Sequence, residues 1–311
     1  MTSGLVDTII SNGARGAIVP FSRVADIKKD MLDLKNGEFH PSWLDRMTAH
    51  MTDGEDRFIP PDMGFAPRSL ISVIIPGPKV ILRFNYLGKA VSCVLPPHFA
   101  NWEANNKRAL RYITEYLAPL GFSAAIARTF PQKMLAVHSG LARYGRNNIC
   151  YNDEFGSYMQ IMTYISDLPC EDTAWSPLGR MERCNECRAC VSACPTGAID
   201  AERRLINSDR CITVVNEFPG EFPEWLDENA HNSIVGCTKC QDSCPANARN
   251  KENIRFGVEF SEEETMELLN HRGDATYSAP VETKLAAAGI SREYTDISVL
   301  PRNLSMLLKS S

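Results

Sequence analysis

The spacing of apolar residues changes several times along the chain, and each spacing predicts a different element. Residues 70–75 form a compact apolar run closed by Pro76 and Pro78, which predicts a buried strand and a turn. Apolar and polar residues then alternate along 80–86 and 90–95 around Gly88, which predicts a hairpin with one buried face. Along 106–120 the apolar residues recur every three or four positions, as on an amphipathic helix.

Weaker patterns predict further elements on both sides of this region. We expect helices and loops up to about residue 60, strands at 122–130 and 158–165, and helices at 132–141 and 302–309. Ser261 and Glu264 have the spacing of a capping box, which predicts a helix start. Two apolar helical faces are expected near the N-terminus, formed by Leu5, Ile9 and Ile10 and by Trp43, Leu44, Met47 and Met51. Because a hairpin is mixed with helices, the pattern predicts an α+β domain with a mixed or antiparallel sheet, extending to about residue 170.

Residues 171–250 are rich in cysteine and poor in long periodic segments. Residues 184–195 read CNECRACVSACP, the C-x2-C-x2-C-x3-C-P spacing of bacterial ferredoxins that hold two iron-sulfur clusters. Residues 237–245 read CTKCQDSCP, a similar run with one cysteine fewer. Cys211 lies between the two runs and supplies the missing thiolate, so eight cysteines are available for two [4Fe-4S] clusters.

In two-cluster ferredoxins the last cysteine of a run binds the other cluster. This rule predicts one ligand set made of Cys184, Cys187, Cys190 and Cys244, and a second made of Cys194, Cys211, Cys237 and Cys240. Structural zinc and disulfides are the alternatives, but zinc needs neither the third closely spaced cysteine nor the proline after each run. Disulfides are disfavoured because no export signal is evident and cytosolic thiols are normally reduced. The spacing therefore favours iron-sulfur clusters.

Composition narrows the class of protein. The chain has 311 residues, 44% hydrophobic and 23% charged, enough for one large core and a smaller domain. A net charge of -5 argues against a broad nucleic-acid surface, which would be basic. No apolar run reaches the roughly 20 residues of a membrane helix. We therefore expect a cytoplasmic protein with no membrane partner.

A second motif, HSGLARYGRNNI at residues 138–149, precedes the cysteine runs and is followed by FGSY at 155–158. Its glycines, Gly140 and Gly145, allow the backbone to approach a ligand closely, and its arginines and asparagines offer hydrogen-bond donors. Turn glycines are also commonly structural, and an Arg-Asn run is often simply solvated. The motif alone therefore leaves a binding site and a structural turn both open.

With its surroundings, this motif resembles the glycine turn of epoxyqueuosine reductases and reductive dehalogenases. The segment at 155–157 and the CVSACPTGAI stretch at 190–199 are similar to theirs as well. The resemblance implies a nitroreductase-like domain at 1–170 that binds cobalamin, a ferredoxin-like domain with two [4Fe-4S] clusters at 171–250, and a helical extension at 251–311. Flavin is the alternative to cobalamin. The implied cofactor contacts are Gly140, Leu141, Arg143, Tyr144, Gly145, Arg146, Asn147, Asn148 and Ser157.

The chain also departs from the resembled pattern. Arg128 stands three residues before Pro131, where epoxyqueuosine reductases carry an aspartate, and Ala142 replaces a glycine of the turn. The chain stops at Ser311, with little room for the helical repeats that those enzymes use to hold tRNA. These departures favour a corrinoid-dependent reductase of an unidentified small substrate, supplied with electrons by a ferredoxin or flavodoxin.

The proton donor and two other functions stay open. Tyr144, His138 and Tyr86 are candidate catalytic donors, because a phenol or an imidazole can supply a proton. One alternative function is an electron-transfer protein that reduces a corrinoid or flavin partner and has no substrate of its own. The other is a tRNA-modifying epoxyqueuosine reductase.

Overall fold

The computed structural model describes residues 1–37, 63–171, 174–203, 205–271, 276–290, 292–293 and 295–309. It contains two compact units, each made of two segments. The first unit comprises Met1–Pro76 and Ala104–Cys187, and the second comprises Gly77–Glu103 and Arg188–Ser311. The expected hairpin thus groups with the C-terminal half of the chain. The sequence-based boundaries at 170 and 250 stay a prediction.

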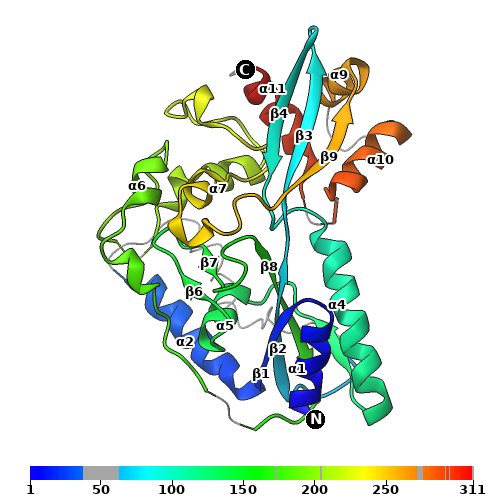
Figure 1. Cartoon of the computed structure of the whole chain (residues 1–311), viewed down its shortest axis with the longest axis vertical. Helices are drawn as coiled ribbons and strands as arrows, with labels where there is room; N and C mark the ends of the chain where they lie inside the picture. Colours follow the sequence, from blue (N-terminus) through cyan, green and yellow to red (C-terminus); the bar gives the residue numbers. More distant parts are fainter. Residues whose placement is uncertain are drawn as a thin grey trace. The chain divides into compact units, whose positions relative to one another are not determined.

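The first unit is built on a four-stranded sheet in the order β1-β2-β8-β5 (Figure 1). Every neighbouring pair in this sheet is antiparallel. The strands are β1 (Arg15–Pro20), β2 (Ser69–Pro76), β5 (Ala124–Ile126) and β8 (Met159–Ser166). The central strands β2 and β8 are almost wholly buried, which explains the continuous apolar run of residues 70–75.

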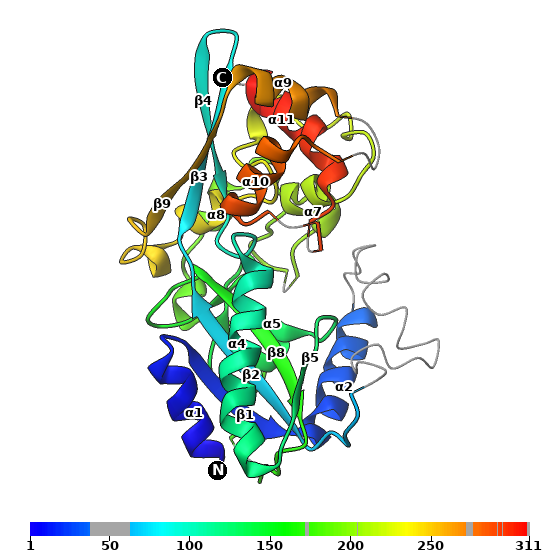
Figure 2. The same cartoon turned by 90° about the vertical axis from the view of Figure 1, so that its right-hand side faces the viewer.

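Helices cover both faces of this sheet. On one face lie α1 (Thr2–Ser11) and α4 (Trp102–Leu117), and on the other lie α2 (Val24–Lys35) and α5 (Gln132–His138), as Figure 2 shows for α1, α4 and α2. Gly16 of β1 permits the close contact with α1, because a Cβ there would lie 2.6 Å from Cδ1 of Ile9. Helices on both faces of a mixed or antiparallel sheet confirm the predicted α+β class.

The second unit contains a three-stranded sheet in the order β4-β3-β9. The hairpin of β3 (Lys79–Tyr86) and β4 (Lys89–Leu95) is antiparallel, and β9 (Ile254–Phe260) runs parallel to β3. The rings of Phe84 and Phe260 stack across the parallel pair with centroids 4.9 Å apart. This sheet packs against α9 (Glu262–Asn270), α10 (Ala279–Ala288) and α11 (Leu300–Lys309).

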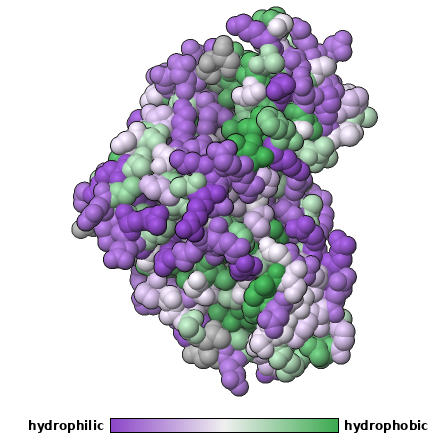
Figure 3. Space-filling model, in the orientation of Figure 1, coloured by the Kyte–Doolittle hydropathy of each residue, from purple (hydrophilic) through white to green (hydrophobic). Residues whose placement is uncertain are grey.

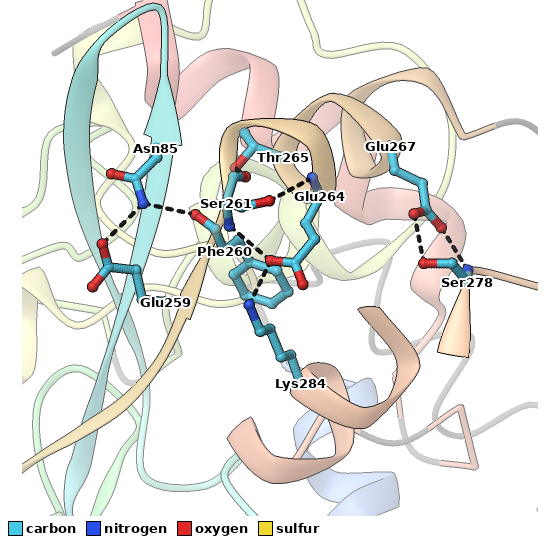
Figure 4. Close-up of polar contacts among 9 residues, drawn as sticks. All are labelled: Asn85, Glu259, Phe260, Ser261, Glu264, Thr265, Glu267, Ser278 and Lys284. Atoms are coloured by element: carbon cyan, nitrogen blue, oxygen red, sulfur yellow. Dashed lines mark hydrogen bonds and ion pairs between the residues drawn. The ribbon is translucent and has the colours of Figure 1, made fainter. Parts of the chain in front are cut away.

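The predicted capping box starts α9 (Figure 4). The backbone N–H of Ser261 donates to Glu264 over 2.7 Å, and the N–H of Glu264 donates to the Ser261 hydroxyl over 3.2 Å. Lys284 of α10 donates to the same carboxylate. Glu264 therefore caps α9 and also joins it to α10.

The cysteine-rich part of the chain is made of short elements. They include α6 (Ala189–Ala193), α7 (Ile212–Glu217) and α8 (Lys239–Asp242). In the first unit, β6 (Arg143–Tyr144) and β7 (Cys150–Tyr151) form a small separate hairpin. Among the described residues, single 3-10 turns lie at Phe21–Arg23, Ala118–Leu120, Glu182–Cys184, Ser208–Arg210, Glu228–Ala230, Pro245–Asn247 and Ile297–Val299.

Local patterns predicted most of these elements, with identifiable errors. The strand expected at 122–130 is limited to Ala124–Ile126, and the strands β1 and β9 lie where only helices and loops were expected. Leu5 and Ile9 are buried as expected, whereas Ile10 is 45% exposed, because a helix only partly covered by a sheet buries a single face. The helical face expected at Trp43, Leu44, Met47 and Met51 lies outside the described residues.

The described helices include none that is both long and apolar enough to cross a bilayer. The face drawn in Figure 3 is largely hydrophilic, with smaller apolar areas between the polar ones.

Candidate iron-sulfur and cofactor site

The cysteines of the second ligand set all belong to the second unit. Cys194 follows α6, Cys211 directly precedes α7, Cys237 lies just before α8, and Cys240 lies within α8. Helices α6 and α8 pack against each other. The fold thus brings together cysteines that are up to 46 positions apart in the sequence.

The thiols of Cys194, Cys211 and Cys237 are close enough to influence one another's ionisation. Burial, with smaller contributions from the neighbouring Cys211 and Cys194, raises the pKa of Cys237 to about 12. Burial also raises the pKa of Cys211, with a smaller contribution from Cys194. Buried thiolates this close together are unfavourable unless a cation compensates them, and iron does so by binding the deprotonated sulfur. This donor set fits a cluster bound by four cysteines.

Polar contacts surround this set. The hydroxyl of Thr196 lies 3.6 Å from the sulfur of Cys194, and Arg210 donates from Nε to the Thr196 carbonyl over 2.9 Å. The guanidinium of Arg210 also lies over the ring of Trp225, 4.7 Å from its centroid. Hydrogen-bonded loops of this kind hold ligands in place around a cluster.

Two residues of α11 hold the segment of chain between Cys211 and Cys237. Arg302 donates to the carbonyls of Val215, Phe218 and Gly220, which are the orphan acceptors at and beyond the end of α7. Asn303 is fully buried and donates to the carbonyls of Asn216 and Ile234 over 2.9 and 2.8 Å. Sequence reasoning missed this clamp, because Arg302 and Asn303 look like the polar face of an amphipathic helix.

The first ligand set is divided between the two units. Cys184 and Cys187 end the first unit, and Cys190 and Cys244 belong to the second. Their sharing of one cluster stays a prediction from the spacing. In the described part of the chain, no three His, Cys, Asp or Glu side chains are placed to share a single metal ion. A [4Fe-4S] cluster does not require such closeness, because its four thiolates bind different irons.

The glycine turn of residues 140–148 joins α5 to the β6-β7 hairpin. The N–H of Gly145 donates to Ile149 over 2.7 Å and closes the turn, and Asn148 adopts a positive φ of 55° there. Asn147 is buried and donates to the hydroxyl of Tyr151 over 2.9 Å. Gly145 is required sterically, because a Cβ would lie 2.6 Å from both Asn147 and Tyr151. Gly145 and Asn147 therefore shape the turn itself.

The other predicted contacts of the turn lie in different environments. Arg143 is exposed and pairs with Asp153, which is also exposed, over 2.6 Å. Arg146 is 5% exposed and donates to the backbone carbonyl of Cys184. Gly140 is exposed with a φ of 77° and open space around its Cα, and Leu141 and Asn148 are half-buried. Ser157 is buried.

The three candidate proton donors do not share one environment. His138 is buried, with Nδ1 2.6 Å from the carbonyl of Ser176 and Nε2 2.8 Å from the carboxylate of Asp30. Tyr144 is half-buried at the end of β6. Tyr86 belongs to the second unit, at the end of β3 opposite Lys89. Both ring nitrogens of His138 are occupied, so a proton given to a ligand would first have to leave one of these contacts.

Comparison with known proteins agrees with this arrangement. Residues 183–247 match the model of a 4Fe-4S double cluster binding domain. The epoxyqueuosine reductase of Shewanella oneidensis is 27% identical over 224 residues, 70% of this chain and 51% of that protein. The epoxyqueuosine reductase of Bacillus subtilis is 31% identical over 115 residues, 37% of this chain and 28% of that protein. The chain thus spans about half or less of the length of these curated relatives.

Solved structures show the same fold over nearly the whole chain. The epoxyqueuosine reductase structure from Bacillus subtilis superimposes with a TM-score of 0.65 at 18% identity, covering 99% of this chain and 81% of that one. An epoxyqueuosine reductase in complex with an epoxyqueuosine-modified tRNA stem loop gives 0.63 at 18% identity, covering 99% and 80%. The chain is therefore a relative of the epoxyqueuosine reductases, with their fold and a double [4Fe-4S] cluster domain.

Proposed function

We propose that this protein is a cobalamin-dependent iron-sulfur reductase that acts on epoxyqueuosine in tRNA. The observation that supports this proposal most strongly is the match of 70% of the chain to an epoxyqueuosine reductase. The substrate differs from the unidentified small molecule favoured by the sequence, because the comparisons support the tRNA alternative better. Because tRNA is a cytoplasmic substrate, the proposal includes a cytoplasmic location.

The cysteines supply the electron path. Eight thiolates in two sets would hold two four-iron clusters, each of which transfers one electron at a time. Reducing an epoxide to an alkene takes two electrons and two protons and releases one water, so two clusters match the electron count. An external electron donor of the ferredoxin or flavodoxin type would reduce the clusters again after each turnover.

The first unit offers polar groups suited to a polar cofactor. Ser72 and Thr163 face each other across β2 and β8, and their buried hydroxyls have no hydrogen-bond partner among the described residues. Buried hydroxyls without partners are the groups that a ligand or an ordered water satisfies. The open space at Gly140 allows a ligand to approach the backbone of the turn. When bound, cobalamin would supply a reducible cobalt, and these groups and the turn would hold and orient it.

The cofactor is tested by an anaerobic visible spectrum of the reconstituted protein, with and without added cobalamin. We expect the spectrum of a corrinoid without its lower axial base, and corrinoid that stays with the protein through gel filtration. An unchanged spectrum with no corrinoid retained would refute the cobalamin part. Parallel addition of flavin tests the alternative cofactor.

The substrate is tested with an epoxyqueuosine-containing tRNA stem loop and the free modified nucleoside, each with a chemical reductant. We expect loss of one oxygen atom by mass spectrometry from the stem loop. Turnover of only the free nucleoside would favour the small-substrate alternative, and turnover of neither would favour an electron-transfer protein. A Cys194→Ser variant is the matched control, because it removes a predicted cluster ligand without changing the turn.

A further inference from the structure

The glycine turn, which is predicted to contact a cofactor, also contacts the start of the cysteine run. Arg146 is 5% exposed, and its guanidinium donates to the main-chain carbonyl of Cys184. Both residues belong to the first unit. A buried guanidinium is thus fixed on the peptide of a predicted cluster ligand.

A second contact aligns the same two segments. The N–H of Tyr144 donates to the carbonyl of Gly179 over 3.2 Å, and the carbonyl of Tyr144 accepts from the N–H of Met181 over 2.8 Å. Tyr144 and Arg180 therefore pair as a short parallel bridge. The N–H of Cys184 in turn donates to the Met181 carbonyl over 2.9 Å. The chain leading to Cys184 is thus held in register with the turn that carries Arg146.

The position of Arg146 has an electrostatic consequence for a bound cluster. An arginine keeps its charge at all ordinary pH values, and a charge acts more strongly at a buried site than in water. Reduction adds one negative charge to a cluster, so a nearby fixed cation stabilises the reduced state more than the oxidised state. Hydrogen bonding, net charge and exposure are the factors by which proteins set cluster potentials.

We propose that Arg146 is a positioning residue of the cluster bound by Cys184, and that its charge raises the reduction potential of this cluster. The contact orients the Cys184 peptide, and the guanidinium favours the added electron. This role requires the iron-sulfur clusters but neither cobalamin nor a tRNA substrate. The role of Arg146 can therefore be refuted while the proposed function stands, and the proposed function can be refuted while the role of Arg146 stands.

The test measures midpoint potentials in a Cys211→Ser background, in which only the cluster of the first set should remain. In Arg146→Gln we expect the potential of that cluster to become more negative by about 59 mV, a tenfold change in the one-electron equilibrium. Arg146→Lys keeps the charge and should recover most of the shift. Arg183→Gln is the matched control, because Arg183 is adjacent to Cys184 in sequence but exposed, where solvent and salt screen its charge.

The readouts are a redox titration followed by electron paramagnetic resonance, iron content and far-ultraviolet circular dichroism. Loss of iron in folded Arg146→Gln but not in Arg146→Lys would support the positioning role. A potential in Arg146→Gln equal to that of the parent would overturn the electrostatic role, as would an equal shift in Arg183→Gln. If Arg146→Gln does not fold, Arg146→Lys decides: a potential close to that of the parent supports the role of the charge, and a full shift overturns it.

Discussion

His138 and Asp30 lie 108 residues apart in the sequence, yet Nε2 of the imidazole is 2.8 Å from Oδ2 of the carboxylate. The other nitrogen, Nδ1, donates to the carbonyl of Ser176 over 2.6 Å, since a carbonyl oxygen only accepts. The ring also stacks on Trp175 with centroids 4.3 Å apart. His138 therefore connects α2, α5 and the segment around residue 175.

Asp30→Asn should lower the free energy of unfolding of the protein by about 1–3 kcal/mol, because it weakens the hydrogen bond to a buried imidazole. Anaerobic urea unfolding of the iron-loaded protein measures this change. Asp33→Asn on the same helix is the control: its partner Lys29 is exposed, so we expect no measurable change. Equal effects of the two substitutions would contradict a special role for the pair of His138 and Asp30.

Cys211→Ser should lower the iron content from about eight to about four per chain, because one ligand of the second set is lost. Iron analysis and the visible absorbance of the reconstituted protein measure this. Cys170 lies outside both ligand sets, so the Cys170→Ser variant should keep the parental iron content. Unchanged iron and spectra in Cys211→Ser would refute the ligand assignment.

We expect His231 to make the stability of the second unit depend on pH in mild acid. Burial lowers the pKa of this imidazole from 6.5 to about 4, with smaller contributions from Arg302 and Lys239. Since the folded state then favours the neutral ring, its stabilising contribution is complete above pH 6.5 and is lost as the pH falls from 6.5 toward 4.

Stability should therefore fall by about 1 kcal/mol from this residue between about pH 7.5 and about pH 5.5. His231→Gln cannot titrate in this range, so its free energy of unfolding should depend less on pH than that of the parent. Urea unfolding of both proteins at the two pH values gives the difference. Identical pH dependence would show that His231 does not contribute.

Arg302→Gln should reduce stability by about 2 kcal/mol, because three carbonyls at and beyond the end of α7 lose a charged donor. Cys211 immediately precedes α7, so we also expect faster loss of iron to a chelator. Lys309→Gln removes an exposed charge from the same helix and serves as the control. Parental stability and iron retention in Arg302→Gln would contradict the role of the clamp.

Local sequence patterns were sufficient to predict the elements that depend on interactions between residues close together in the sequence. Four features could be predicted in this way: the two cysteine runs, the hairpin around Gly88, the capping box of Ser261 and Glu264, and the helix that α4 confirms. Spacing, turn chemistry and capping all act over a few residues. The edge strands β1 and β9 were missed, because β9 is exposed along most of its length and carries little apolar alternation.

The candidate site also has one part that the sequence predicted and another that depends on tertiary contacts. The sequence alone predicted the eight cysteine ligands, with Cys211 as the one missing from the second run. Only the tertiary structure decided that Arg146 lies on Cys184, that Asp30 occupies a nitrogen of His138, and that Arg302 clamps the end of α7. Each of these contacts joins residues at least 38 positions apart, and no local periodicity specifies which distant acceptor a buried donor will meet.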